Sequence, residues 1–323
     1  MNFHIKKGVE KTRKQWYNEK ERGDILRREG VSMIFPTDDT ACPCGSGLPY
    51  AACHKKTDLA LAPFRARGEH IPPRRMIKTA AQIEGCRAAG AVNSAVLDAV
   101  SKMIAPGITT AEIDDTVMRE TRALGATPAC LGFEGFPKAV CTSVNEVVCH
   151  GIPSEMCVLK EGDILNVDCT TIYDGYFGDA SRMYGIGRIG KEAEELISVT
   201  EEAVKLAVSH LAPYTSHLGD IGYDISALAH RHGFRVVREI GGHGVGLKMH
   251  EDPFVAHTGF RGTGLVLAPG MIFTVEPMIN AGTARVYQDA RDGWTIRTAD
   301  GRLSAQVEYE VLITETGHEI LSK

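Results

Sequence analysis

Residues 163–185, DILNVDCTTIYDGYFGDASRMYG, constrain the fold more than any other stretch of the sequence. Two strand-like runs flank a central Asp-Gly dipeptide, which strongly favours a two-residue hairpin turn. This turn pairs Thr170 with Asp179, and Asp168 lies two residues before Thr170 on the same face of the sheet. We therefore expect Asp168 and Asp179 to be diagonal neighbours, about 7–8 Å apart at the backbone, with both side chains reaching one point.

Two carboxylates directed at one point of a sheet interior repel each other, so a positive charge must compensate them or one must stay protonated. The hairpin alone favours a simpler interpretation, in which the aspartates face solvent or pair with an arginine such as the nearby Arg182. Other parts of the sequence therefore have to decide whether this is a site.

Further acidic and imidazole groups occur in three other apolar stretches. His243 lies in the Gly-rich segment GGHGVG, where the backbone can approach a ligand closely, and His250 follows seven residues later. Glu276 ends the apolar run GMIFTVE, and Glu308 and Glu310 alternate with apolar residues in SAQVEYEV. Apolar strands that carry so many carboxylates are difficult to explain as protein surface.

These motifs make residues 76–323 resemble the type I methionine aminopeptidases of the pita-bread family. The matching segments are SVNEVVCHGIP, NVDCTTIYDGYFGDAS, GGHGVG, MHEDP, FTVEPMI and SAQVEYEV. The resemblance implies an α+β, pita-bread fold with duplicated helix-helix-strand halves around a curved antiparallel sheet. The apolar pattern also gives the order helix, helix, strands twice, over 79–185 and 190–314, which hints at the same duplication.

The resemblance further implies a dinuclear metal centre in which Asp179 and Glu308 bridge the two ions. The five implied ligands are Asp168, Asp179, His243, Glu276 and Glu308. Such an oxygen-rich set suits Mn²⁺, Fe²⁺ or Co²⁺ better than a thiolate-seeking zinc site. Two ions about 3.5–4 Å apart can share a water, lower its pKa and aim hydroxide at a carbonyl.

The resemblance assigns substrate contacts to two histidines. His250 is expected to stabilise the oxyanion, His150 to hydrogen-bond the scissile amide nitrogen, and Glu276 to shuttle a proton. The resemblance also implies an apolar pocket for the methionine side chain, formed by Cys130, Phe133, Cys141 and Trp294, with Phe136 close by. Family members often have tyrosine at positions 133 and 136 and an aromatic residue at 249, so the shape of the pocket is expected to differ here. From residue types alone, these cysteines and aromatic residues would be ordinary core.

Residues 42–56 contain a compact pattern of metal-binding side chains, C-x-C-x8-C-H. Cys42, Cys44, Cys53 and His54 are sufficient for tetrahedral zinc, and a closed site of four ligands indicates a structural role. The segment resembles the SEC-C zinc motif. The alternative is a set of unrelated reduced cysteines.

The sequence predicts four parts. These are a basic N-terminal arm (1–41), the SEC-C-like zinc motif (42–56), a linker rich in Pro and Arg (57–75) and the pita-bread metallopeptidase domain (76–323). Residues 1–78 hold 16 Lys and Arg against 9 Asp and Glu, whereas the remainder holds 20 against 32. The basic residues around the zinc motif indicate either solubility or docking on ribosomal RNA near emerging nascent chains. They are Lys6, Lys7, Lys11, Arg13, Lys14, Lys55, Lys56, Arg65, Arg67, Arg74 and Arg75.

The chain has no export signal and no apolar run of about 18 residues, so we expect a cytoplasmic protein without a membrane span. Its nine cysteines then indicate reduced thiols or metal ligands. We expect a monomer that removes the initiator methionine from nascent proteins when the second residue is small. Two alternatives stay open, a related peptidase that cuts before proline and a catalytically inactive module that binds nascent chains or RNA.

Overall fold

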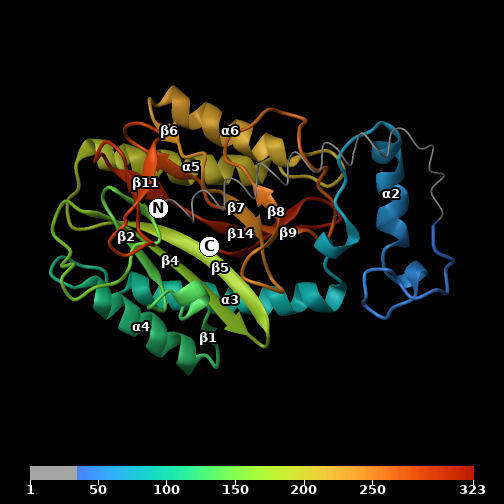
Figure 1. Cartoon of the computed structure of the whole chain (residues 1–323), viewed down its shortest axis with the longest axis horizontal. Coiled ribbons are helices and arrows are strands. Elements are labelled where there is room, and N and C mark those ends of the chain that lie inside the picture. The colour runs from blue at the N-terminus through green and yellow to red at the C-terminus, as the bar shows by residue number, and fades with distance from the viewer. Residues whose placement is uncertain (1–34) are drawn as a thin grey trace. The chain divides into compact units, whose positions relative to one another are not determined.

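The computed structural model describes residues 35–323 and divides the chain into two compact units, 1–56 and 57–323 (Figure 1). Residues 1–34 of the predicted basic arm (1–41) lie outside the described residues. They include Lys6, Lys7, Lys11, Arg13 and Lys14. Within the described part of the first unit, a bridge between Ala41 and Pro49 closes the cysteine-rich turn. A 3₁₀ turn, Tyr50–Ala52, follows.

The prediction of a linker over 57–75 is wrong for the first half of this segment, which is helical, because helix α2 spans Lys55–Ala66. Pro63 lies inside this helix and removes one backbone hydrogen bond. Leu61 is nevertheless fully buried and Phe64 packs against the same core. Burial of these apolar side chains offsets the hydrogen bond that Pro63 removes. The Pro and Arg content of the segment gives no sign of this burial. A second 3₁₀ turn, Arg74–Met76, leads into the main domain.

The first half of the main domain begins with two helices whose starts are encoded in the sequence. Helix α3 spans Ala80–Ser101 and α4 spans Thr110–Ala123, and each begins with a capping box, formed by Thr79 with Gln82 and by Thr109 with Glu112. The strands that follow are β1 (Thr127–Pro128), β2 (Cys141–Val144), β3 (Val147–Cys149), β4 (Ile164–Tyr173) and β5 (Tyr176–Gly185), with a 3₁₀ turn at Phe133–Gly135.

The second half repeats this order. It begins with helices α5 (Lys191–Ser209) and α6 (Leu218–Arg231). The ten strands after them are β6 (Arg235–Val236), β7 (Gly242–Gly244), β8 (Glu251–Val255), β9 (Ile272–Val275), β10 (Met278–Asn280), β11 (Val286–Gln288), β12 (Ile296–Thr298), β13 (Ser304–Gln306), β14 (Tyr309–Ile313) and β15 (His318–Ser322).

Antiparallel strands form four sheets between the two helix pairs, with α3 and α4 on one side and α5 and α6 on the other (Figure 1). The first sheet joins β1, β4 and β2, with β5 on β4, and the largest has the order β15-β14-β9-β7-β8. Backbone hydrogen bonds between Ser181 of β5 and Glu308 connect these two sheets. The hydrophobic core has two main clusters. In one, α3 and α4 pack against the hairpin of β4 and β5, and in the other, α5 and α6 pack against strands of the second half.

The predicted hairpin is confirmed in its register. Thr170 pairs with Asp179, and Tyr173 with Tyr176, on either side of the Asp-Gly turn. Among the described residues, no helix is both long enough and apolar enough to cross a bilayer.

Candidate metal centre

The two hairpin aspartates lie on the same face of the first sheet. Asp168 of β4 is opposite Ser181, and Asp179 of β5 is opposite Thr170. Thr170 donates its hydroxyl hydrogen to Asp179 Oδ1 at 2.9 Å, which fixes the direction of that carboxylate. The first half of the domain thus presents two carboxyl groups to one point.

The second half brings an imidazole and two more carboxyl groups to the same point. His243 Nε2 lies 3.8 Å from Asp179 Oδ2 and 3.5 Å from Glu276 Oε1. The ligand atoms of Asp179, His243 and Glu308 lie within 4.8 Å of one another. Four of the five sequence-predicted ligands therefore approach one another directly, although they come from both halves of the domain.

Asp168 is connected to this group through Gln306, a residue that sequence reasoning did not identify. Gln306 Nε2 donates to Glu276 Oε2 at 3.2 Å, and the same side chain offsets part of the effect of burial on the pKa of Asp168. Gln306 is fully buried at the end of β13 and precedes Glu308 by two residues. The signal that could have found it is this two-residue spacing from an acidic residue in an apolar strand.

Burial and mutual repulsion strongly perturb these carboxyl groups. Burial raises the pKa of Asp168 to about 7. Burial, followed by repulsion from the neighbouring carboxylates, raises the pKa values of Asp179, Glu276 and Glu308 well above their ordinary values. In the described part of the chain, no lysine or arginine forms an ion pair with any of these four groups. The cluster therefore lacks a protein counter-charge and is suited to cations.

The orientation of His243 also fits a metal ligand. Its Nδ1 lies 3.1 Å from the carbonyl oxygen of Gly244, and because a carbonyl only accepts, Nδ1 carries the proton. The lone pair of Nε2 then faces the carboxylates. Burial lowers the pKa of His243 to about 3, so the ring is neutral at physiological pH, as a ligand must be.

Several buried groups hold these side chains in place. Thr274 accepts a hydrogen bond from the backbone N–H of His243 at 3.0 Å and donates its hydroxyl to Glu276 Oε1 at 2.8 Å. His257 Nε2 accepts from the backbone N–H of Glu276 at 3.1 Å. Glu310 Oε2 accepts from the backbone N–H of Asp179 at 3.0 Å. Thr274 and His257 were not predicted, because neither lies in a metal-ligand pattern.

The remaining predicted site residues surround the metal centre on one side. The ring of His250 lies 4.3 Å from that of His243 and 5.1 Å from that of Phe133, in both cases edge to face. His150 lies 6.4 Å from Trp294, measured between ring centroids. Burial lowers the pKa of His150 to about 4, so this imidazole is neutral.

A small apolar cluster lies beside these histidines. Its buried members are Cys130, Phe136 and Cys141, and Met249 and Trp294 pack against it. Phe136 and Trp294 meet edge to face at 5.2 Å. Three of the four predicted pocket residues therefore gather here, with Phe136 at the centre, whereas Phe133 lies against His250.

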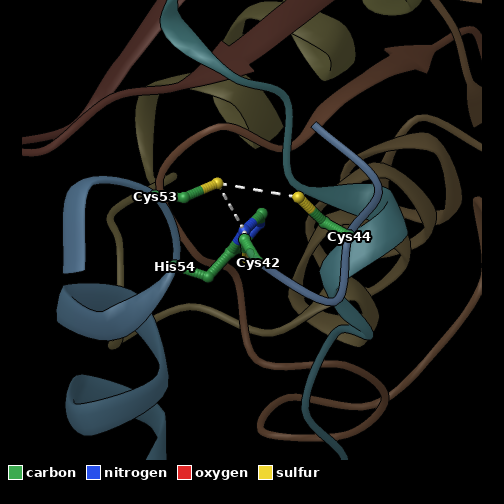
Figure 2. A group of neighbouring side chains, drawn as sticks. All are labelled: Cys42, Cys44, Cys53 and His54. Atoms are coloured by element: carbon green, nitrogen blue, oxygen red, sulfur yellow. Dashed lines mark hydrogen bonds between the residues drawn. The ribbon is translucent and has the colours of Figure 1, made fainter. Parts of the chain in front are cut away.

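The cysteine-rich turn forms a second cluster of potential ligands (Figure 2). Its Sγ and imidazole atoms all lie within 4.8 Å of one another. His54 Nδ1 is 3.3 Å from Cys42 Sγ and 3.1 Å from Cys53 Sγ, and the Cys44 and Cys53 sulfurs are 3.6 Å apart. Two thiols and an imidazole in such contact, with a third thiol beside them, match a tetrahedral zinc donor set.

The fold and both clusters agree with comparisons to known proteins. Residues 84–315 match metallopeptidase family M24, and residues 40–56 match the SEC-C motif. The chain therefore belongs to metallopeptidase family M24, and its fold is the expected pita-bread fold. M24 membership implies divalent metal ions in the catalytic domain, and the SEC-C motif implies a separate metal site.

Within this family, the chain is similar to methionine aminopeptidases. It is 49% identical over 242 residues to methionine aminopeptidase A of Synechocystis, covering 75% of this chain and 94% of the relative. It is 44% identical over 250 residues to the Escherichia coli K12 enzyme, covering 76% and 93%. The crystal structure of the Rickettsia prowazekii methionine aminopeptidase superposes with a TM-score of 0.75 at 43% identity, covering 76% and 99%. An X-Pro aminopeptidase of Thermotoga maritima, at 23% identity, a TM-score of 0.60 and coverage of 77% and 62%, shares the fold alone.

Proposed function

We propose that the chain is a methionine aminopeptidase that removes the N-terminal methionine from nascent proteins whose second residue is small. The observation that carries this function is the direct approach of three carboxyl groups and one imidazole from both halves of the domain, beside an apolar cluster that contains sulfur and aromatic groups. The high identity to methionine aminopeptidases over nearly their whole length supports the same activity.

Asp168, Asp179, His243, Glu276 and Glu308 are the residues that would hold two divalent ions. When bound, such a pair of ions supplies activation of water at neutral pH and polarisation of the scissile carbonyl. We propose Mn²⁺, Fe²⁺ or Co²⁺ in these positions, because oxygen ligands outnumber the single nitrogen and no thiol belongs to the set. The absence of a lysine or arginine partner in the described ion pairs of the cluster supports this assignment.

The protein's own groups then orient the substrate and move the proton. His250 would donate a hydrogen bond to the oxygen of the attacked carbonyl, and His150 would hydrogen-bond the scissile amide nitrogen. Both imidazoles are neutral near pH 7, since burial lowers their pKa values, so each has one N–H group that can donate a hydrogen bond without a charge on the ring. Glu276 would accept the proton of the attacking water and deliver it to the leaving amine.

The methionine side chain would enter the apolar cluster. Cys130, Cys141 and Trp294 would line this pocket, and Phe133 would close it next to His250. Phe136, the buried centre of the cluster, would support the wall formed by Trp294. Sulfur and aromatic edges suit a flexible, unbranched thioether, which makes favourable contacts with both.

The assay that tests this function compares three activities. We expect purified protein to release methionine from Met-Ala-Ser in the presence of Mn²⁺, Fe²⁺ or Co²⁺, to lose this activity with a chelator, and to leave an Xaa-Pro peptide intact. Cleavage of the Xaa-Pro peptide alone would favour the peptidase that cuts before proline. Failure to cleave either peptide with every metal would favour an inactive binding module.

We propose that Cys42, Cys44, Cys53 and His54 hold one structural Zn²⁺, since the four groups leave no open position for a substrate. Metal analysis of protein purified without added metal tests this assignment. A chain with Cys53→Ala should contain about one zinc fewer per molecule, because three remaining ligands hold the ion poorly. Unchanged zinc content would contradict it.

We also propose that the protein is a cytoplasmic monomer that docks on ribosomes through its basic residues. We expect the described basic residues to bind ribosomal RNA only weakly, because four of them already form ion pairs with acidic residues. The pairs are Lys55 with Asp38, Arg67 with Glu69, Arg74 with Asp58 and Arg75 with Asp252. Sedimentation with ribosomes at increasing salt tests the docking, and light scattering tests the oligomeric state. Ribosome binding that survives deletion of residues 1–54, which leaves helix α2 and its buried Leu61 in place, would contradict the proposed role of the arm.

A further inference from the structure

The loop 245–250 between β7 and β8 carries His250 to the metal centre. In this position His250 contacts both His243 and Phe133 with its ring. The loop contains Gly246 with a φ of +124°, and Leu247, Lys248 and His250 are exposed. Such a segment needs a specific restraint if its histidine is to keep one position.

Glu251 supplies a restraint from the inner side of the loop. Its Oε1 accepts hydrogen bonds from the backbone N–H groups of Leu247 at 2.7 Å and Lys248 at 2.9 Å. Its Oε2 accepts from Lys78 Nζ at 2.7 Å. The side chain of Lys78 is 1% exposed and that of Glu251 is 13% exposed, so this ion pair is buried. Charge-assisted bonds in such surroundings are short and directional.

Lys78 is itself fixed to the frame of the domain. Its backbone N–H donates to the carbonyl of Gly270 at 2.8 Å, and the preceding Ile77 forms a bridge with Met271, directly before β9. Strand β9 pairs with β7, which carries His243. The counter-charge of Glu251 is therefore attached to the same sheet as the metal ligand that His250 touches.

The loop also rests closely on the first half of the domain. A Cβ added at Gly246 would come within 2.6 Å of Cys86 Sγ on α3, and the carbonyl of Gly246 accepts from the N–H of Phe177 at 2.9 Å. The backbone at this point is thus held from two sides, and Glu251 fixes the part of the loop that follows.

We propose that Glu251, with Lys78 as its buried counter-charge, is a positioning residue that sets the location of the His250 imidazole. This inference rests on the proposed function, because that function gives His250 its contact with the substrate. Glu251 touches neither the reacting atoms nor the five predicted ligands. Its effect on turnover passes through the backbone of residues 247–250.

The test uses Glu251→Gln in the full chain. Glutamine keeps the size and one acceptor oxygen but removes the charge, which leaves Lys78 buried without a partner. We expect kcat on Met-Ala-Ser to fall about 10- to 100-fold, as a displaced catalytic group requires, while KM changes little. Amide hydrogen exchange at Leu247 and Lys248 should become faster. The matched control is Asp252→Asn, which breaks the neighbouring, exposed pair with Arg75 and should keep kcat within about twofold.

A double-mutant cycle with His250→Ala separates positioning from general stability. If Glu251 acts through His250, adding Glu251→Gln to His250→Ala lowers kcat/KM no further. A full additional loss in the His250→Ala background, or unchanged exchange at Leu247 and Lys248, would overturn the inference. If Glu251→Gln does not fold, the Lys78→Met/Glu251→Gln pair removes the unpaired charge and enters the same cycle. A wild-type protein that never cleaves Met-Ala-Ser would contradict the proposed function, whereas the exchange measurement would still test the restraint.

Discussion

At the scale of single residues, Asp179 joins the two halves of the candidate centre. Its carboxylate lies near His243 and accepts from Thr170, and its backbone N–H donates to Glu310. We expect Asp179→Asn to reduce kcat/KM below about one hundredth of the wild-type value, because the loss of even an outer partner of a metal ligand costs 10- to 100-fold. Hydrolysis of Met-Ala-Ser measures this.

The control for Asp179→Asn is Asp98→Asn, the same chemical change in an exposed pair with Arg182 on the outer side of β5. This variant should keep wild-type activity within about twofold, since exposed ion pairs contribute little. Near-normal turnover by Asp179→Asn would remove the two-metal assignment.

A second prediction at this scale concerns protons. Burial raises the pKa of Asp168 to about 7, so the folded, metal-free protein still holds a proton there after the unfolded chain has released it. Metal ions bind only the deprotonated group, so they must displace this proton at pH 6 but not well above pH 7. We expect metal affinity to rise with pH through neutrality, because the raised pKa values of Asp179, Glu276 and Glu308 leave further protons for the metal ions to displace. Calorimetry in buffers of different ionisation enthalpy should show proton release on Mn²⁺ binding at pH 6, and its absence there would contradict this prediction.

At the scale of secondary structure, the hairpin depends on a close approach between α3 and β5. A Cβ added at Gly178, the residue before Asp179, would come within 2.4 Å of the carbonyl oxygen of Ala89 in the helix. We expect Gly178→Ala to destabilise the fold by about 1–3 kcal/mol, because the helix or the strand must shift. Denaturant unfolding measures this, with Gly317→Ala as control, since the space around Gly317 is open. Equal stability of both variants would contradict the close packing.

The same scale shows which elements could be predicted. Both capping boxes and the Asp-Gly turn are local signals, so helices α3 and α4 and the register of the hairpin follow from the sequence. Strands β7 and β8 could not be predicted, because glycines and a proline hide their pattern. Helix α2 contains Pro63 and depends on the burial of Leu61, which is a tertiary effect.

For the candidate site, the sequence predicts the residues that lie in local motifs but not those that are related to the centre only by contacts in space. Asp168, Asp179 and His243 occur in recognisable motifs, so their candidacy can be stated from the sequence. Gln306 and His257 each form one hydrogen bond to Glu276, Gln306 to its side chain and His257 to its backbone N–H. Both bonds join residues that are distant in the sequence. Only the folded arrangement relates these residues to the centre.

At the scale of the whole molecule, two clusters of potential metal ligands lie in two separate units. We expect Cys53→Ala to lower the zinc content while retaining hydrolysis of Met-Ala-Ser within about threefold, because a closed structural site does not take part in the chemistry. Metal analysis and the peptide assay on the same sample check this. A loss of hydrolysis as large as that of Asp179→Asn would show that the units are coupled.

The bridge between Ser181 and Glu308 has a consequence for synthesis of the protein. The hairpin leaves the ribosome well before the strand that completes the centre, because more than a hundred residues separate them in the chain. A polypeptide that terminates prematurely, just before Glu308, carries three of the four acidic groups of the candidate centre and lacks the fourth. Such fragments would lack one of the proposed metal ligands, and only a copy translated past this point would hold the full set.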